Sequence, residues 1–238
     1  MENATEKKTM VSLPTVKELL EAGVHFGHQA TRWNPKMKLY IFQKKNGIHI
    51  IDLMRTHQLM LKACQVVSEI SKRNGKILFV GTKKQAWQIV KSYAQSVNMP
   101  YISNRWIGGL LTNYKVVSHN INRLNSLTKD LANNDFLAKY TKKEIQAFKE
   151  EQKNLLNIYE GVQNLNRLPD AVFVIDSHNE KTAVAEAVRK KIPVIAIMDT
   201  NADPDLIDYP IPANDDSYKS LDLLIKTIAA NIGAPKSN

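Results

Sequence analysis

The sequence predicts an α/β protein with a doubly wound parallel sheet, into which a helical hairpin is inserted. Three runs, at 77–81, 171–176 and 192–198, consist almost entirely of β-branched and other apolar residues. Strands that are buried on both faces of a parallel sheet have this composition. Helix-forming segments follow the first two runs, and this alternation indicates right-handed β-α-β crossovers.

The first element expected along the chain is a short β-hairpin. Residues 39–42 and 48–51 are apolar runs on either side of Asn46-Gly47, a pair typical of two-residue hairpin turns. We expect this hairpin at a sheet edge. An apolar-periodic stretch over 59–67 follows and contains Cys64, the only cysteine, so an intramolecular disulfide and a zinc site of several thiolates are excluded. We expect its thiol to be buried.

Two helices are expected directly after the first two buried strands. Residues 82–85, with the sequence Thr-Lys-Lys-Gln, fit a capping box that opens a helix over 86–97. Asp176-Ser177 precede a second helix over 180–190. The apolar stripe of this second helix comprises Ala183, Val184, Ala187 and Val188.

The middle of the chain predicts an antiparallel coiled-coil hairpin. Apolar residues step by alternating threes and fours, the spacing of a coiled-coil seam. The first series is Val117, Ile121, Leu124 and Leu131, with Thr128 in register, and the second is Ile145, Phe148, Leu155, Tyr159 and Val162, with Gln152 in register. We expect residues 112–162 to stand out from a body formed by 1–111 and 163–238. The alternative is two ordinary helices that cover the sheet.

The charge distribution favours a polyanionic partner or an anionic membrane surface. The 238 residues carry 33 Lys and Arg against 23 Asp and Glu, a net charge of +10. Residues 1–168 hold 26 basic and 12 acidic side chains, whereas 169–238 hold 7 and 11. No run of about 18 apolar residues suits a membrane span, and the N-terminus lacks a signal-peptide core. We therefore expect a cytosolic protein.

An Arg-Trp pair occurs twice, as Arg32-Trp33 and Arg105-Trp106, in turn-rich and positively charged segments. A guanidinium presents a planar fork of donors to phosphate, and an indole stacks on a base or sugar, so the combination suits irregular RNA. No nucleophile with a neighbouring base accompanies either pair. The alternative is that each Trp is a half-buried packing residue and each Arg a solvated charge.

A possible phosphate site lies where the strand at 77–81 ends. Gly81, Thr82, Lys83 and Lys84 place free amides, a hydroxyl and two ammonium groups at an expected helix N-terminus. The segment lacks the spacing of a Walker loop and the three glycines of a dinucleotide fingerprint, so it does not favour a nucleotide cofactor. An RNA phosphate would satisfy the same groups.

A metal site is considered at two places, and we expect none. His25 and His28 lie three residues apart, and a later loop holds Asp199, Asp203, Asp205 and Asp208. The spacing matches neither a closed zinc set nor a calcium loop. The acidic loop follows a strand and so lies at the carboxyl edge of the sheet, where paired carboxylates could serve two-metal chemistry. Its prolines favour instead a rigid structural loop, because no nucleophile or glycine cradle accompanies the acids.

Five blocks of the chain, taken in order, resemble the bacterial ribosomal protein S2 family over almost the whole length. They are residues 22–29 with 32–37, 79–86, 105–113, 168–171 and 199–216. The departures are small: Ser103-Asn104 precede Arg105 where the family commonly has Asn followed by Glu or Gln, and Ala202 and Ala213 replace commoner residues.

The resemblance implies a structural RNA-binding protein of the small ribosomal subunit with a flavodoxin-like body and a protruding coiled coil. It implies a late-assembling protein on the solvent side between head and body, which contacts neighbouring ribosomal proteins and helps to recruit ribosomal protein S1. The residues it places at RNA are Arg32, Trp33, Asn34, Lys36, Lys38, Lys83, Lys84, Arg105 and Trp106. No catalytic residue or cofactor is implied. A nucleotide-dependent enzyme on the same fold is the alternative, and sedimentation with small subunits would separate the two.

Overall fold

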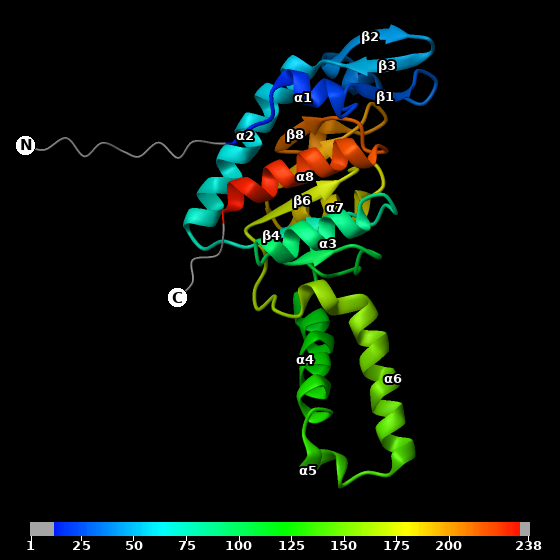
Figure 1. The fold of residues 1–238 in the computed structure, drawn as a ribbon, viewed down its shortest axis with the longest axis vertical. Coiled ribbons are helices and arrows are strands. Elements are labelled where there is room, and N and C mark those ends of the chain that lie inside the picture. The colour runs from blue at the N-terminus through cyan, green and yellow to red at the C-terminus, as the bar shows by residue number, and fades with distance from the viewer. Residues whose placement is uncertain (1–11, 234–238) are drawn as a thin grey trace, which may run out of the picture.

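A five-stranded parallel sheet forms the centre of the molecule in a computed structural model that describes residues 12–233 (Figure 1). Its strands are β4 (Ile77–Val80), β5 (Tyr101–Ile102), β6 (Ala171–Ile175), β7 (Val194–Met198) and β8 (Tyr209–Pro212). All neighbouring strands pair in parallel, in the order β5-β4-β6-β7-β8. This is the flavodoxin-like order, in which the second strand lies outside the first, and it confirms the predicted fold class.

The three strands predicted from apolar runs are β4, β6 and β7, and two further strands were not predicted. β5 has only two residues, too few for a periodic pattern. β8 contains Pro210 and Pro212, and its sequence was interpreted as part of a rigid loop. That interpretation was wrong for 209–212, because β8 is an edge strand, where proline does not remove a needed hydrogen bond.

A separate three-stranded antiparallel sheet lies at one end of the molecule (Figure 1). It consists of β1 (Phe26–Gln29), β2 (Ile41–Lys45) and β3 (Ile48–Ile51), in the order β1-β3-β2. The predicted hairpin is β2 and β3, and Asn46 and Gly47 both have the positive φ that its turn requires. The hairpin does not extend the parallel sheet. Residues 39–40 belong to the 3-10 helix η1 (Pro35–Tyr40) and not to the strand.

Helices cover both faces of the parallel sheet. α1 (Val16–Glu21), α2 (Leu53–Lys72), α3 (Trp87–Ser96) and α8 (Tyr218–Ile232) share a core with one face, and α7 (Lys181–Arg189) packs on the other. Successive residues of β4 alternate between these cores. Cys64 lies in the first core, and burial raises the pKa of its thiol to about 12, as expected for an unreactive thiol. Among residues 12–233 no helix combines the length and apolarity of a membrane span.

The start of α3 and the apolar stripe of α7 differ from the predicted ones. α3 begins at Trp87, and its N-cap, Ala86, has no side-chain hydrogen bond. The predicted capping residue Thr82 instead donates its hydroxyl to Glu180, 2.5 Å away, so no capping box forms there. In α7, Val188 is exposed and Glu186 is buried in its place, which corrects the predicted apolar stripe.

The inserted hairpin stands out from the body, with α5 (Asn134–Leu137) at its far end (Figure 1). Its long helices are α4 (Tyr114–Asp130) and α6 (Lys142–Tyr159), and Thr141 opens α6 with the predicted capping box. Gln152 donates to the Thr128 hydroxyl at 3.1 Å, which joins the two polar positions of the predicted seam. The seam is broader than predicted, because Leu127 is buried and Thr128 is exposed.

Burial along the hairpin decreases from its base to its tip. At the base, Val117, Ile121 and Leu124 belong to the same core as sheet residues Leu78 and Val80. At the tip the packing is a cluster of three aromatic rings whose centroids lie 4.7–5.9 Å apart, those of Phe136, Tyr140 and Phe148. The base is therefore continuous with the body, and an independently stable hairpin of residues 112–162 stays a prediction.

Two substitutions should separate the base from the tip. Leu124→Ala should lower the free energy of global unfolding by about 3 kcal/mol, because it leaves a cavity in the shared core. Phe148→Ala should leave global unfolding nearly unchanged and expose the tip to protease, because its loss affects only the aromatic cluster. Urea titration and mapping of cleavage sites measure the two effects. Equal global destabilisation by both variants would contradict this separation.

Candidate nucleic-acid interface at the carboxyl edge of the sheet

Three distant segments of the chain meet at the edge where the parallel strands end, here called the carboxyl edge. Lys83-Lys84 follow β4, and Arg105-Trp106 follow β5. The segment that begins at Arg32 reaches the same edge because the Asn34 amide donates to the Thr200 carbonyl, 2.8 Å away, just beyond β7. The parallel topology thus gathers residues that the sequence pointed to separately.

Four of the predicted RNA-binding residues have cationic side chains that are exposed to solvent. Arg32, Lys38, Lys84 and Arg105 are all exposed. Within residues 12–233 none of their side chains forms an ion pair or a hydrogen bond, in contrast to Lys36 and Lys83. These guanidinium and ammonium groups are therefore free to meet an external anion.

Lys36 and Asn34 have structural partners. The Lys36 ammonium pairs with Asp203 at 2.8 Å and also with Asp205. The hydrogen bond to Asp203 is the main reason that the pKa of Lys36 is raised. The Asn34 side chain accepts from the Lys36 amide at 3.0 Å and so caps η1. These contacts shape the loop, and direct contact of either residue with RNA stays a prediction.

Lys83 points into the protein, with only 17% of its side chain exposed. Its ammonium lies 2.7 Å from Asp215 Oδ1, 2.6 Å from Asp216 Oδ1 and 3.3 Å from Asp176 Oδ2. The Thr82 amide, predicted to hold a phosphate, donates to Glu180 Oε1 at 2.9 Å. The protein's own carboxylates thus occupy the groups of the expected phosphate site, and RNA contact by Lys83 stays a prediction.

Both tryptophans of the Arg-Trp pairs are half-buried and pack within the protein. Trp33 meets the ring of His49 edge-on, with centroids 5.0 Å apart. The indole N–H of Trp106 donates to Glu186 Oε1 at 2.9 Å. This arrangement favours the packing interpretation of the indoles, while the arginines beside them remain exposed.

Glu186 is a buried carboxylate that organises the loop between β5 and α4. Besides Trp106, it accepts hydrogen bonds of 2.8–3.1 Å from the amides of Gly109, Leu111 and Thr112 and from the Thr112 hydroxyl. Burial alone would raise the pKa of Glu186, but these donors outweigh it and lower the pKa. Glu186 was not predicted as a functional residue from the sequence. Its signal was an acid three residues after Ala183, on the apolar face of α7.

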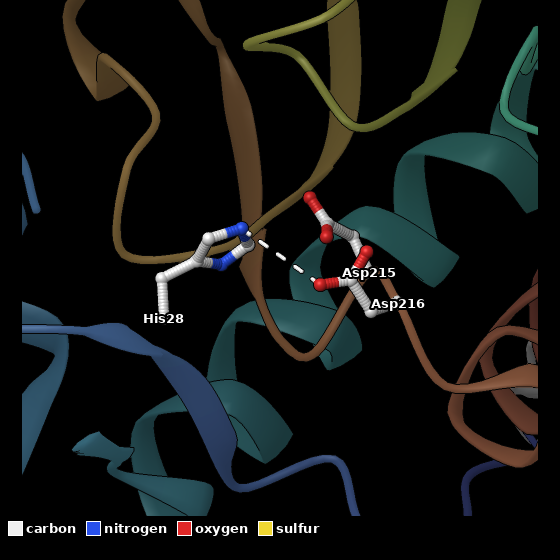
Figure 2. Close-up of side chains that lie close together, drawn as sticks. All are labelled: His28, Asp215 and Asp216. Carbon is white, nitrogen blue, oxygen red and sulfur yellow. Dashed lines mark ion pairs between the residues drawn. The ribbon is translucent and has the colours of Figure 1, made fainter. Parts of the chain in front are cut away.

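His28 joins the N-terminal sheet to the carboxyl edge. Its ring Nδ1 lies 2.8 Å from Asp199 Oδ2, and its backbone amide donates to Asp199 Oδ1 at 3.1 Å. The hydrogen bond to Asp199 raises the pKa of His28. Of the two histidines considered for metal binding, His28 also faces Asp215 and Asp216 (Figure 2), whereas His25 stacks on Phe26.

The remaining acids of the loop have structural roles. Asp203 and Asp205 hold Lys36, and Asp208 accepts from the Val194 amide at 2.8 Å. Asp203 also caps the 3-10 helix η3 (Pro204–Leu206). The structure therefore supports the interpretation of 199–208 as a rigid structural loop, with Asp199 the member that contacts His28.

The chain matches known proteins over nearly its whole length. The model of the family described as ribosomal protein S2 matches residues 19–234. The chain is 46% identical to small ribosomal subunit protein uS2 of Rickettsia akari (strain Hartford), over 92% of this chain and 74% of that protein. It is 46% identical to the protein of the same name from Corynebacterium kroppenstedtii, over 93% and 78%, and 44% identical to that from Thermobifida fusca, over 92% and 75%.

Replacement of the Glu186 carboxylate should loosen the β5–α4 loop. Glu186→Gln should lower the free energy of unfolding by about 3 kcal/mol at neutral pH, because an amide nitrogen would face buried donors. Because the folded pKa of Glu186 is lowered, its stabilisation is present above the unfolded value of about 4.5 and is lost as pH falls through the folded pKa. The difference between wild type and variant should therefore shrink in acid.

Denaturant titration at several pH values and the fluorescence of Trp106 measure this effect. Glu69→Gln, an exposed replacement on α2, is the matched control and should change stability little. Equal stability of the Glu186 and Glu69 variants at neutral pH would show that the carboxylate does not hold the loop.

Proposed function

This chain belongs to the ribosomal protein S2 family, and we propose that its carboxyl edge binds the RNA of the small ribosomal subunit. Its role is structural, that of a ribosomal protein and not of an enzyme. The observation that carries the RNA proposal is that the segments reaching this edge carry exposed cations: Arg32, Lys38, Lys84 and Arg105. Phosphate contacts by lysine and arginine supply much of the affinity of proteins for nucleic acids.

The mode of binding we infer is recognition of RNA shape through phosphates. Arg32 and Arg105 offer planar forks to phosphate oxygens, whereas Lys38 and Lys84 act as point charges. Glu186 holds the loop that carries Arg105, so less conformational entropy is lost when RNA binds. The half-buried indoles of Trp33 and Trp106 pack within the protein and support these loops. We therefore infer that stacking of the indoles on bases contributes little to RNA binding.

The elongated form of the molecule suits a position between separate parts of the subunit. The hairpin and the three-stranded sheet lie at opposite ends, with the parallel sheet between them (Figure 1). We propose that the protein stabilises the head–body region on the solvent side of the subunit, contacts neighbouring ribosomal proteins and resides with ribosomes in the cytoplasm. Late assembly would fit a protein that adds to RNA already folded.

We further propose that the three-stranded sheet takes part in recruiting ribosomal protein S1. Large apolar side chains are exposed on this sheet and on η1: Leu39 at 66%, Phe42 at 70%, Phe26 at 49% and Ile48 at 37%. Exposed apolar residues concentrated on one small element mark a protein-binding face. This face lies at the end of the molecule away from the hairpin, and it adjoins the proposed RNA interface at η1, where Leu39 follows Lys38.

Variants of the exposed cations test the RNA interface. Arg105→Lys should weaken incorporation into small subunits although charge is kept, because an ammonium does not reproduce the guanidinium fork. Lys84→Ala should reduce the slope of log affinity against log salt by roughly 0.7–0.9, the value of one lost phosphate contact. Filter binding to small-subunit RNA over a salt series and sedimentation of lysates measure both.

The matched control is Lys72→Ala, because Lys72 is an exposed lysine at the end of α2, which leads into the opposite edge of the sheet. It should bind RNA like the wild type. If Lys72→Ala and Lys84→Ala change the slope equally, binding is a property of net charge and the carboxyl edge is not the interface. Recovery of the protein only in the soluble fraction would contradict the ribosomal role itself.

Loss of the apolar face should affect protein S1 alone. Leu39→Ser with Phe42→Ser should reduce the protein S1 retained on purified small subunits several-fold, while incorporation of the variant itself is unchanged, because both side chains are exposed. Quantitative immunoblotting of sedimented subunits gives both values. Val188→Ser, an exposed apolar replacement on α7, is the control. Normal retention of protein S1 by the double variant would remove this face from the proposal.

A further inference from the structure

We propose that His28, Asp215 and Asp216 bind a divalent transition-metal ion, for which zinc is the best fit. One ligand atom from each side chain lies within 4.8 Å of the other two. His28 comes from β1, and the two aspartates come from the loop between β8 and α8, so residues far apart in sequence converge (Figure 2). The RNA interface proposed above does not depend on this site.

The first observation is a buried carboxylate oxygen without a partner. The Lys83 ammonium forms ion pairs with the Oδ1 atoms of Asp215 and Asp216. Oδ2 of Asp215 is buried and accepts no hydrogen bond, and only 1% of this side chain is exposed. A buried oxygen of this kind is costly unless a donor or a cation meets it. A cation between Asp215 and His28 would satisfy it.

The second observation is the orientation of the imidazole. Nδ1 of His28 lies 2.8 Å from Asp199 Oδ2, so the ring proton is held on that nitrogen. Nε2 is left facing Asp216 Oδ2, 3.8 Å away, and an ion bound to Nε2 would displace any proton there. A carboxylate that orients a histidine through its other nitrogen is the usual support of a metal ligand.

The third observation is the balance of charge. Four carboxylates lie around this point: those of Asp176, Asp215 and Asp216 are within 3.3 Å of the Lys83 ammonium, and that of Asp199 pairs with His28. Lys83 is the lysine that contacts three of the four carboxylates. The remaining excess of negative charge favours a divalent cation over a second monovalent partner.

The ligand types select the class of ion. A neutral imidazole with two carboxylates suits zinc, whereas magnesium prefers oxygen ligands alone. Zinc ligands lie about 2.0–2.2 Å from the ion, so the three groups must move closer together on binding. Asp216 is 57% exposed and free to make that movement. The Asn201 amide nitrogen lies 3.3 Å from His28 Nε2, and an ion bound to Nε2 would replace this contact.

Such an ion would cross-link the N-terminal sheet to the loop before α8. The experiment uses the purified full-length chain, stripped of metal with a chelator and titrated with zinc chloride by calorimetry. We expect one ion per chain, retained against about a hundredfold excess of magnesium because of the nitrogen ligand. Asp216→Asn and His28→Asn should each weaken binding at least tenfold. Asp205→Asn and His119→Asn, exposed replacements elsewhere, should bind zinc as the wild type does.

Circular dichroism checks that the variants are folded, and anomalous scattering at the zinc edge locates the ion in crystals of the wild type. A peak between His28 and Asp216 supports the proposal even if a variant does not fold. Absence of stoichiometric binding, displacement by magnesium, wild-type affinity in both ligand variants or a peak elsewhere would each overturn it.

Discussion

Neutralisation of carboxylates at the carboxyl edge is the constraint on which much of the molecule depends. Parallel strands end together, and here four aspartates follow their ends or the loops beside them: Asp176, Asp199, Asp215 and Asp216. Lys83 joins three of them, and His28 pairs with the fourth. Asp176, Asp199 and Asp215 are buried, and buried carboxylates are stable only with such partners. The same pairs fasten β1 and the start of α8 to the central sheet.

This arrangement also separates the protein from the nucleotide enzymes that share its fold. In doubly wound sheets the crevice between the first and third strands commonly receives a phosphate. In this protein the carboxylates of Glu180 and Asp215 lie there instead. Glu180 accepts a hydrogen bond from the Thr82 amide, and Asp215 pairs with the Lys83 ammonium. The cations available to an external partner lie instead on exposed loops and on η1: Arg32, Lys38, Lys84 and Arg105. A surface of this kind suits the backbone of a large RNA better than a small ligand.

Glu186 links the body to both the hairpin and the proposed RNA interface. Its carboxylate accepts hydrogen bonds from the loop between Trp106 and Thr112, which follows Arg105 and leads into α4. The direction in which the hairpin leaves the body therefore depends on a residue of α7, more than fifty positions later in the chain. Burial of the charge is tolerated because five donors surround it.

The sequence by itself determined the features that arise from local periodicity: the strands β4, β6 and β7, the β2–β3 turn at Asn46-Gly47, the seam with its Thr128–Gln152 pair, and the excess of positive charge. Only the tertiary structure decided which charged residues are available. Lys83 and Lys84 are neighbours of identical chemistry, yet one is enclosed by carboxylates and the other is exposed. The partners of Lys83 lie more than ninety residues away, and so do those of His28. Pairing of charges depends on distance in space, which a one-dimensional pattern does not contain.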